Sequence, residues 1–329
     1  MSKFIQTSDI HVGECRSLDG YLERHQGVLQ QITDLAVERR VPLIVPGDIF
    51  HAKTTTHAER FVVDEWFGDL ERKSIPTIIT AGNHDHLWGE VTQLDGYAKL
   101  PFKFVKIVTW KPQTVKIGDM GFICISWGKY TTSQIRDIVT KKLPYIEDSK
   151  YKIVLLHECI TGVKLDNGFV MPSGTAIPKM PSITYWAVGD IHSYQKTNVG
   201  NGYYAGAPAQ FKFDDKEPKG AIVVDLDHPS AQPEFVPLRS KPLRTVTSIK
   251  DIKDDAYYKI KGSLEEVILA NREPSVVKSE FVKTSEDVLE YEKVGIVDGL
   301  PEFLSEKGVE AAEQKKAVEW VREVVGGSA

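Results

Sequence analysis

The chain has few cysteines, no long apolar run and no repeated or low-complexity segment. Its three cysteines form no pairing framework and no Cys-x-x-Cys motif, which indicates a reducing compartment. No run approaches the roughly 18 apolar residues of a membrane span, and no signal peptide precedes the first apolar segment. We therefore expect a cytoplasmic protein without a membrane segment.

The composition is that of a soluble globular protein. Hydrophobic residues make up 41% and charged residues 26% of the 329 positions. This length suits one large domain with a smaller appendage.

Five short polar motifs lie in the first two-thirds of the chain, each at the end of an apolar run. They are Asp9-Ile10-His11, Gly47-Asp48, Gly82-Asn83-His84-Asp85, the single His157, and Gly189-Asp190-Ile191-His192. Six of the nine histidines lie in or beside these motifs. Aspartate, asparagine and histidine in these numbers suit two metal ions rather than one, so the sequence predicts a binuclear metallohydrolase.

The apolar runs are short and rich in β-branched residues, as in strands that are buried on both faces of a sheet. They cover residues 4–5, 41–45, 76–79, 152–156 and 183–188. Apolar spacing predicts helices over 19–40 and 57–72. Strands that alternate with helices form an α/β sheet whose ligands gather at the carboxyl ends of the strands. A lone Gly-Asp could be only a turn, but five motifs in order favour a site.

The order of these motifs resembles that of the calcineurin-like metallophosphoesterases. Within that superfamily, Gly47-Asp48-Ile49-Phe50-His51 is similar to the form found in SbcD-type double-strand-break repair nucleases, the phage and bacterial recombination branch. Protein Ser/Thr phosphatases instead carry Asp-Arg-Gly and Gly-Asn-His-Glu, and neither is present. Residues 204–208 and 241–244 also resemble SbcD-type segments, so the likeness covers roughly residues 1–260.

The resemblance implies a fold and a domain order. The fold would be an α/β/β/α sandwich with a small C-terminal capping domain and a terminal helix. The expected divisions are a nuclease domain over 1–240, a capping domain over 241–300 and a helical partner-docking tail over 301–329. The protein would act in the cytoplasm, or in the host cytoplasm if a phage encodes it.

The resemblance also implies two divalent metal ions, Mn²⁺ in first place and Mg²⁺ as the alternative. The expected ligands are Asp9, His11 and His192 for the first ion, Asp48 between the ions, and Asn83, His157 and Asp190 for the second. Two close cations repel each other, so a carboxylate is needed between them. Many relatives have histidine where Asp190 stands, and a hard oxygen donor there shifts the preference away from Zn²⁺. The alternative is that Asp190 only caps a turn.

Three residues would take part in catalysis without holding metal. His84 would approach the scissile phosphate and stabilise or protonate the leaving alkoxide, and Asp85 would hydrogen-bond its other ring nitrogen. His51 resembles the histidine with which nuclease members orient the phosphodiester. The alternatives are a structural role for His84 and a turn or helix-start role for His51. His86 lies outside the pattern, as a solvated loop residue.

Charge is unevenly spread along the chain. Residues 101–152 carry ten Lys or Arg against four acids, and this stretch could follow a phosphate backbone or form a solvated mixed face. Residues 263–329 carry fifteen acids and eight bases, so this end is a poorer DNA contact. Two bound divalent cations would change the formal net charge of the protein from −5 to −1.

The C-terminal region is predicted to contain strands over 256–262 and 274–283, a helix over 263–270 and a helix or helix pair over 301–325. Ala317, Trp320, Val321 and Val324 fall on one face of the last helix. In SbcD-type nucleases such helices dock on an SbcC-like ATPase of the SMC family, which with DNA is the expected partner. The alternative is a helix that packs on its own domain, and a homodimer is left open.

The leading hypothesis is a Mn²⁺-dependent DNA nuclease, exo- or endonucleolytic, that acts in repair or recombination. One alternative is a small-molecule phosphodiesterase or phosphatase, which would need neither His51, a basic stretch nor a docking helix. The other is a metal-binding scaffold without catalysis, which the intact His84-Asp85 pair argues against.

Overall fold

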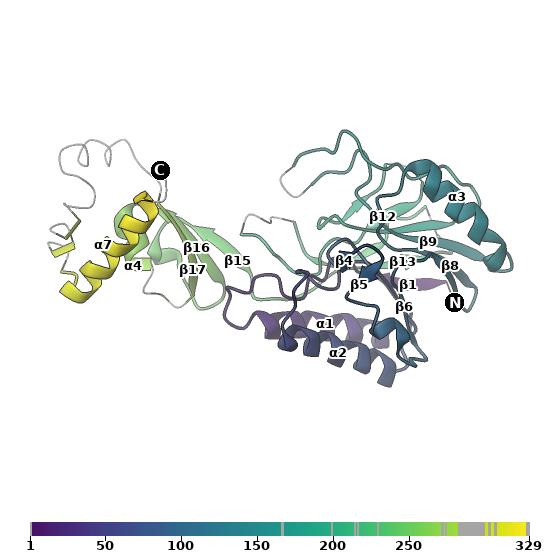
Figure 1. The fold of residues 1–329 in the computed structure, drawn as a ribbon, viewed down its shortest axis with the longest axis horizontal. Helices are drawn as coiled ribbons and strands as arrows, with labels where there is room; N and C mark the ends of the chain where they lie inside the picture. Colours follow the sequence, from purple (N-terminus) through teal and green to yellow (C-terminus); the bar gives the residue numbers. More distant parts are fainter. Residues whose placement is uncertain are drawn as a thin grey trace. The chain divides into compact units, whose positions relative to one another are not determined.

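The computed structural model describes residues 2–165, 168–198, 200–213, 215, 217–228, 230–270, 273, 275–281, 300–301, 304–305 and 308–326. The chain divides into two compact units, Met1–Lys241 and Pro242–Ala329, and both are drawn in Figure 1. The expected separation of 241–300 from 301–329 stays a prediction.

The first unit contains two six-stranded sheets. The first has the order β14-β13-β1-β2-β3-β6, in which β1, β2, β3 and β6 run parallel and β13 and β14 are antiparallel additions at one edge. Its strands are β1 (Lys3–Gln6), β2 (Leu43–Pro46), β3 (Thr77–Thr80), β6 (Val105–Val108), β13 (Gly220–Asp225) and β14 (Glu234–Pro237). The strands expected near residues 4, 41 and 76 are therefore confirmed as neighbours in one sheet.

The second sheet has the order β11-β12-β10-β9-β8-β7. Its strands are β7 (Gln113–Ile117), β8 (Met120–Ile125), β9 (Tyr151–His157), β10 (Tyr185–Gly189), β11 (Gln195–Lys196) and β12 (Gly202–Tyr204). Strands β8, β9, β10 and β12 are parallel, whereas β7 and β11 pair antiparallel at the two edges. Strands β9 and β10 are the ones expected at 152–156 and 183–188.

Three apolar cores separate four layers. Helices α1 (Tyr21–Arg39) and α2 (His57–Arg72) lie side by side and share a core with the first sheet (Figure 1). A second core, with Phe4, Ile44 and Phe122, lies between the two sheets. A third joins the second sheet to helix α3 (Thr132–Lys142). The α/β/β/α sandwich is thereby confirmed.

Local chemistry explains where helix α2 begins. The Thr56 hydroxyl accepts a hydrogen bond from Glu59 N at 3.2 Å, and the Glu59 carboxylate accepts one from Thr56 N at 2.7 Å. This reciprocal arrangement satisfies main-chain donors that the first helical turn leaves without partners. The helix therefore begins at His57, the predicted residue.

Gln6 ties the two sheets together close to the motif ends. This side chain is fully buried between the sheets. Its amide nitrogen donates to Tyr203 O at 2.8 Å and to Val188 O at 3.2 Å, and its oxygen accepts from the Tyr185 hydroxyl at 3.0 Å. A buried amide with all of these partners holds β1 in register against the second sheet.

Short elements complete the first unit. Strands β4 (His86–Trp88) and β5 (Val91–Thr92) form a small hairpin, and the 3₁₀ turns are η1 (Tyr97–Lys99) and η2 (Leu143–Ile146). None of the described helices is long and apolar enough to cross a membrane.

The second unit is a three-stranded parallel sheet with helices. It contains β15 (Leu243–Val246), η3 (Ile249–Asp251), β16 (Tyr257–Gly262), α4 (Leu264–Ala270), β17 (Val276–Phe281) and α7 (Ala311–Gly326), with the strand order β15-β16-β17. The predicted strand at 256–262 and helix at 263–270 are confirmed. Residues 274, 282 and 283 of the predicted strand at 274–283 lie outside the described residues. Strand β17 lies within the rest of this range.

Part of the apolar face of α7 packs within the second unit. Val321 is buried in a cluster with Leu300 and Leu304, and Trp320 packs against the same cluster. The side chain of Val324 lies outside the described residues. For the described residues, the alternative of a helix packed on its own domain holds. Ala317 and Trp320 stay partly exposed, and docking of the tail on a partner stays a prediction.

Candidate metal centre

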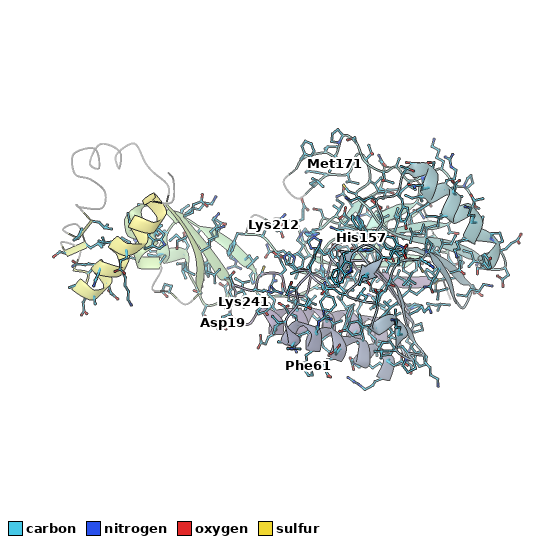
Figure 2. The ribbon with its side chains drawn as sticks, in the orientation of Figure 1. Asp19, Phe61, His157, Met171, Lys212 and Lys241 are labelled. Carbon is cyan, nitrogen blue, oxygen red and sulfur yellow. The ribbon has the colours of Figure 1, made fainter. Side chains whose placement is uncertain are left out.

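The five motifs converge at the carboxyl ends of five parallel strands. Asp9 follows β1, Asp48 follows β2, Asn83 follows β3, His157 ends β9 and Asp190 follows β10. Figure 2 shows His157 within the interior of the first unit. The structure brings all seven predicted ligands into one cluster, because neighbouring parallel strands end at the same edge of their sheet.

One group of donors contains Asp9, His11 and His192. A ligand atom from each lies within 4.8 Å of the others, and Asp9 and His11 are buried. The Nε2 atoms of His11 and His192 are 3.1 Å apart. Burial lowers the pKa of His11 well below its ordinary value, and neighbouring His192 lowers it further. His11 is therefore neutral at physiological pH, the form in which imidazole binds a metal.

A second group gathers around His157. Its Nε2 is within 4.8 Å of ligand atoms of Asp9 and Asp48, 2.9 Å from the Asn83 amide and 3.6 Å from Asp190 Oδ1. The opposite nitrogen, Nδ1, lies 2.8 Å from Pro46 O. A main-chain carbonyl can only accept, so Nδ1 carries the proton and Nε2 is directed towards the carboxylates.

Asp48 lies between the two groups. Its Oδ2 is 3.5 Å from His11 Nε2 and 3.4 Å from His157 Nε2. Burial by itself would raise the pKa of Asp48, but the imidazoles of His157 and His11 hold it below the usual range. An ionised carboxylate at this position is placed as a ligand shared by two cations would be.

The backbone at the site adopts an uncommon conformation. Asp9, His11 and Asp48 have φ values of 54°, 50° and 57°, and Asp190 has 100°. Positive φ costs free energy in residues other than glycine and persists where the surroundings enforce it. The strand ends therefore turn sharply and direct four predicted ligands into the cluster.

Two glycines allow this close approach. A Cβ on Gly47, which has φ +91°, would collide with the His157 ring, and a Cβ on Gly82 would collide with the main chain and carboxylate of Asp48. The motifs therefore need glycine at these positions for a steric reason.

The residues fit a pair of divalent cations. Asp9, Asp48 and Asp190 crowd into a mostly buried space, where burial raises the pKa of Asp9 and raises that of Asp190 to about 7. Carboxylates packed together in this way are costly without a cation to offset their charge. Three carboxylates, one amide and three imidazoles form a donor set that could hold metal, and none of these donors is a thiolate.

His84 and His51 lie beside the cluster and are half-buried. Their rings stack with centroids 5.3 Å apart, and His84 meets His11 edge-on at 4.7 Å. Glu14 Oε2 lies 2.5 Å from His51 Nδ1.

The predicted partner of His84 is wrong. His84 Nδ1 lies 2.5 Å from the main-chain oxygen of His51, whereas the Asp85 carboxylate accepts hydrogen bonds from the main-chain nitrogens of Ile49, Phe50 and Gly82. Asp85 is fully buried and turned towards the loop after β2, so those three amides satisfy its carboxylate in place of the imidazole. Asp85 thus joins the second motif to the third.

The environment of Asp85 is strongly perturbed. Burial and the nearby Asp48 carboxylate raise the pKa of Asp85 to about 7, and the three main-chain donors oppose this shift. Its main-chain partners indicate a role in holding the loops together.

The expectation of a solvated loop for His86 is also wrong. His86 is only 6% exposed and begins β4, and its ring packs between those of Trp110 and Trp127 at 5.3 Å and 5.2 Å. The two tryptophans are distant from His86 in the sequence, so the residues next to His86 could not predict that its ring is buried.

Sequence reasoning missed Glu14. This carboxylate follows the first motif by three residues, in the turn where Glu14 N donates to His11 O at 2.8 Å. The available signal was an acidic residue close behind a metal-binding motif, but its partner His51 belongs to a different motif.

The basic stretch is spread over several layers. Lys106 lies on β6 of the first sheet, Lys116 on β7 of the second, and others lie on α3. Lys116 pairs with Asp148 at 2.5 Å, and Lys150 with an aspartate at 3.3 Å. These positions favour the alternative of a solvated mixed face.

Comparison with known proteins identifies the family. The profile described as "Calcineurin-like phosphoesterase" matches residues 2–194. The chain belongs to the calcineurin-like phosphoesterase family. The matched region contains all seven clustered donors, and membership makes the chain a hydrolase of the phosphoesterase type.

More specific likenesses are weaker. The DNA double-strand break repair protein Mre11 of Sulfurisphaera tokodaii is 23% identical over 261 residues, which cover 75% of this chain and 66% of that protein. The chain thus spans a little less than two thirds of that relative's length. Among solved structures, TT1561 of Thermus thermophilus is similar with a TM-score of 0.47 and 14% identity, covering 72% of this chain and 99% of that one.

Proposed function

We propose that this chain is a metal-dependent phosphodiesterase that acts on DNA as a nuclease in repair or recombination. The observation that carries the proposal is the position of two half-buried imidazoles, His84 and His51, beside the buried donor groups. The two imidazoles can contact a bound phosphodiester, and the seven donors of the neighbouring cluster would hold the metal ions.

The chain's own residues have separable tasks. Asp9, His11 and His192 would hold one cation, Asn83, His157 and Asp190 the other, and Asp48 both. Bound there, divalent cations supply positive charge for the phosphate oxygens and acidify water. His84 keeps one proton on Nδ1 against the His51 carbonyl, so its Nε2 is the nitrogen that, when it carries a second proton, can give that proton to the leaving oxygen.

Support for DNA as the substrate comes from two likenesses. The second motif resembles that of SbcD-type nucleases, and the curated relative is named as a DNA double-strand break repair protein. Mn²⁺, with Mg²⁺ as the alternative, suits a site made of oxygen and nitrogen donors with three carboxylates. The cytoplasm is the proposed place of action.

One experiment tests the proposal. Purified protein is incubated with Mn²⁺, with Mg²⁺ or with EDTA, on end-labelled linear DNA and in parallel on bis-p-nitrophenyl phosphate. We expect cleavage of both substrates with Mn²⁺ and none with EDTA. Full activity after exhaustive chelation would exclude the metal mechanism, and bound metal without cleavage of either substrate would support the scaffold alternative.

A small-molecule phosphodiesterase is the second candidate. The dispersal of the basic stretch over separate layers, with Lys116 and Lys150 in ion pairs, favours it. Cleavage of bis-p-nitrophenyl phosphate without any cleavage of DNA would decide for this candidate.

The proposal extends to an SbcC-like ATPase as partner, which the SbcD-type resemblance implies. We place the docking surface on the helical tail over 301–329. Affinity capture with purified ATPase, with and without ATP, tests this extension.

A further inference from the structure

The ring of His51 is held by a carboxylate from another loop. Glu14 Oε2 lies 2.5 Å from His51 Nδ1, and the two side chains are 24% and 37% exposed. The ring of His51 stacks on His84, and one nitrogen each from His11, His51 and His84 lies within 4.8 Å of the others. Neither the metal site nor the proposed catalytic roles use Glu14.

The surroundings of the carboxylate determine where the His51 proton lies. Glu14 Oε2 is enclosed by protein and accepts no hydrogen bond in good geometry among the described residues, and the nitrogen it faces is His51 Nδ1. A buried carboxylate oxygen without a donor is costly. The contact with His51 is therefore favourable only when Nδ1 carries a proton. Nε2 is then the nitrogen left to meet a substrate.

The main chain fixes the distance between the two residues. Glu14 N donates to His11 O at 2.8 Å, and His51 N donates to Val12 O at 3.0 Å. The turn that carries Glu14 is thus bonded to the segment that carries His51. The pair is arranged before any substrate arrives, which spares the entropy of ordering it during the reaction.

We infer that Glu14 is a positioning residue, whose carboxylate holds the Nδ1–H of His51 and so directs Nε2 towards the substrate, where Nε2 takes up a second proton and donates it in a hydrogen bond to a non-bridging oxygen of the phosphodiester. This inference rests on the proposed function. Its effect is confined to His51, because His84 Nδ1 is held by the main-chain oxygen of His51 at 2.5 Å. Two neighbouring imidazoles are oriented by two different acceptors.

Kinetics test the consequence for the reaction. Glu14→Ala should lower kcat on bis-p-nitrophenyl phosphate by about 10- to 100-fold, with KM and metal stoichiometry unchanged. Glu14→Gln should recover most of kcat, because its amide oxygen can still accept from Nδ1–H. The matched control is Glu23→Ala, which removes an exposed carboxylate on α1. In a His51→Ala background, Glu14→Ala should cause no further loss.

Nitrogen-15 spectra of histidine test the contact without turnover. The whole chain is measured with Mg²⁺ at pH 8, and the His51 signals are those that His51→Gln removes. We expect the His51 proton on Nδ1 in the wild type and on Nε2 in Glu14→Ala. If Glu14→Ala does not fold, Glu14→Asp replaces it, since a carboxylate one methylene shorter loses the contact.

The outcomes separate this inference from the proposed function. A wild-type proton on Nε2, or a Glu14→Ala kcat equal to that of Glu23→Ala, overturns the inference while phosphodiester cleavage stands. If the metal-loaded wild type cleaves no phosphodiester, the proposed function fails. The spectra alone then decide whether Glu14 holds His51.

Discussion

At the scale of single residues, two histidines of the site, His157 and His84, have a main-chain acceptor behind the ring. His157 Nδ1 faces Pro46 O at 2.8 Å, and His84 Nδ1 faces His51 O at 2.5 Å. Both acceptors belong to the main chain, which cannot be removed by substitution. The imidazoles are therefore held in one tautomer by the fold itself, with Nε2 directed away from these acceptors.

His84→Ala should abolish catalysis while both metals still bind, because His84 is not among the seven donors. General acid–base groups contribute typically about 10²–10⁴-fold, so the loss of kcat should be of that order. Turnover of bis-p-nitrophenyl phosphate and calorimetric titration with Mn²⁺ measure the two effects. His228→Ala, at an exposed histidine, is the control. A missing metal in His84→Ala would show that His84 is a ligand.

Asp190→Ala should weaken the second metal selectively, and Asp190→His should retain activity with an altered metal preference. We expect this because Asp190 lies among the predicted ligands of the second ion. Its Oδ1 is 3.6 Å from His157 Nε2, and the carboxylates of Asp9 and Asp48 lie near it. Calorimetry with Mn²⁺ and Zn²⁺ gives stoichiometry and affinity, with exposed Asp137→Ala as control. Wild-type affinity in Asp190→Ala would mean that Asp190 only shapes the turn, where its N–H donates to Asp9.

At the scale of elements, the site depends on how closely the strand ends approach. The loops after β2 and β3 meet where Asp48 accepts from His84 N at 2.9 Å and Asp85 accepts from Phe50 N at 2.9 Å. These bonds link the second and third motifs into one rigid unit. Glycine is required at the contact because the Asp48 loop occupies the space of a side chain.

Gly82→Ala should reduce metal affinity and activity together, because the added methyl group must displace Asp48. The control is Gly96→Ala, since a Cβ there meets nothing within 4 Å and its φ is −63°. Calorimetry and thermal unfolding of both variants measure the effects. If Gly82→Ala bound metal as tightly as Gly96→Ala, the close packing of the two loops would not matter for the site.

At the scale of the whole molecule, the metal donors and the core that contains α7 lie in different units. All seven donors lie in Met1–Lys241, and α7 completes a core of the second unit. Chemistry at the metal centre and stability of the second unit should therefore respond to different changes.

Deletion of residues 301–329 should leave metal binding and cleavage of bis-p-nitrophenyl phosphate intact. It should lower the free energy of unfolding of the second unit, because Val321 and Trp320 leave their core, and it should weaken capture of the ATPase. Trp320→Ala should reproduce part of the destabilisation, up to about 3 kcal/mol. Exposed Glu319→Ala serves as control in thermal unfolding. A deletion that keeps wild-type stability would show that α7 is dispensable to its unit.

Much of the fold could be predicted because buried parallel strands are continuous apolar runs. Strands β1, β2, β3, β9 and β10 and helices α1 and α2 were expected within a few residues of where they lie. No element was named in advance at 105–108 or 220–225, where β6 and β13 lie. Both are short, and their place in a sheet is set by neighbours far away in the chain.

For the site, the sequence by itself determined which donors are present and that each follows a strand. The order of five motifs was enough to expect Asp9, Asp48, His157 and their companions in one cluster. Only the tertiary structure decided which side chain meets which acceptor. Asp85 lies 36 residues from Ile49, whose N–H it accepts, and Glu14 meets a histidine of another motif. Such pairs depend on how parallel strands are staggered and how their end loops turn, and no periodicity along the chain encodes that geometry.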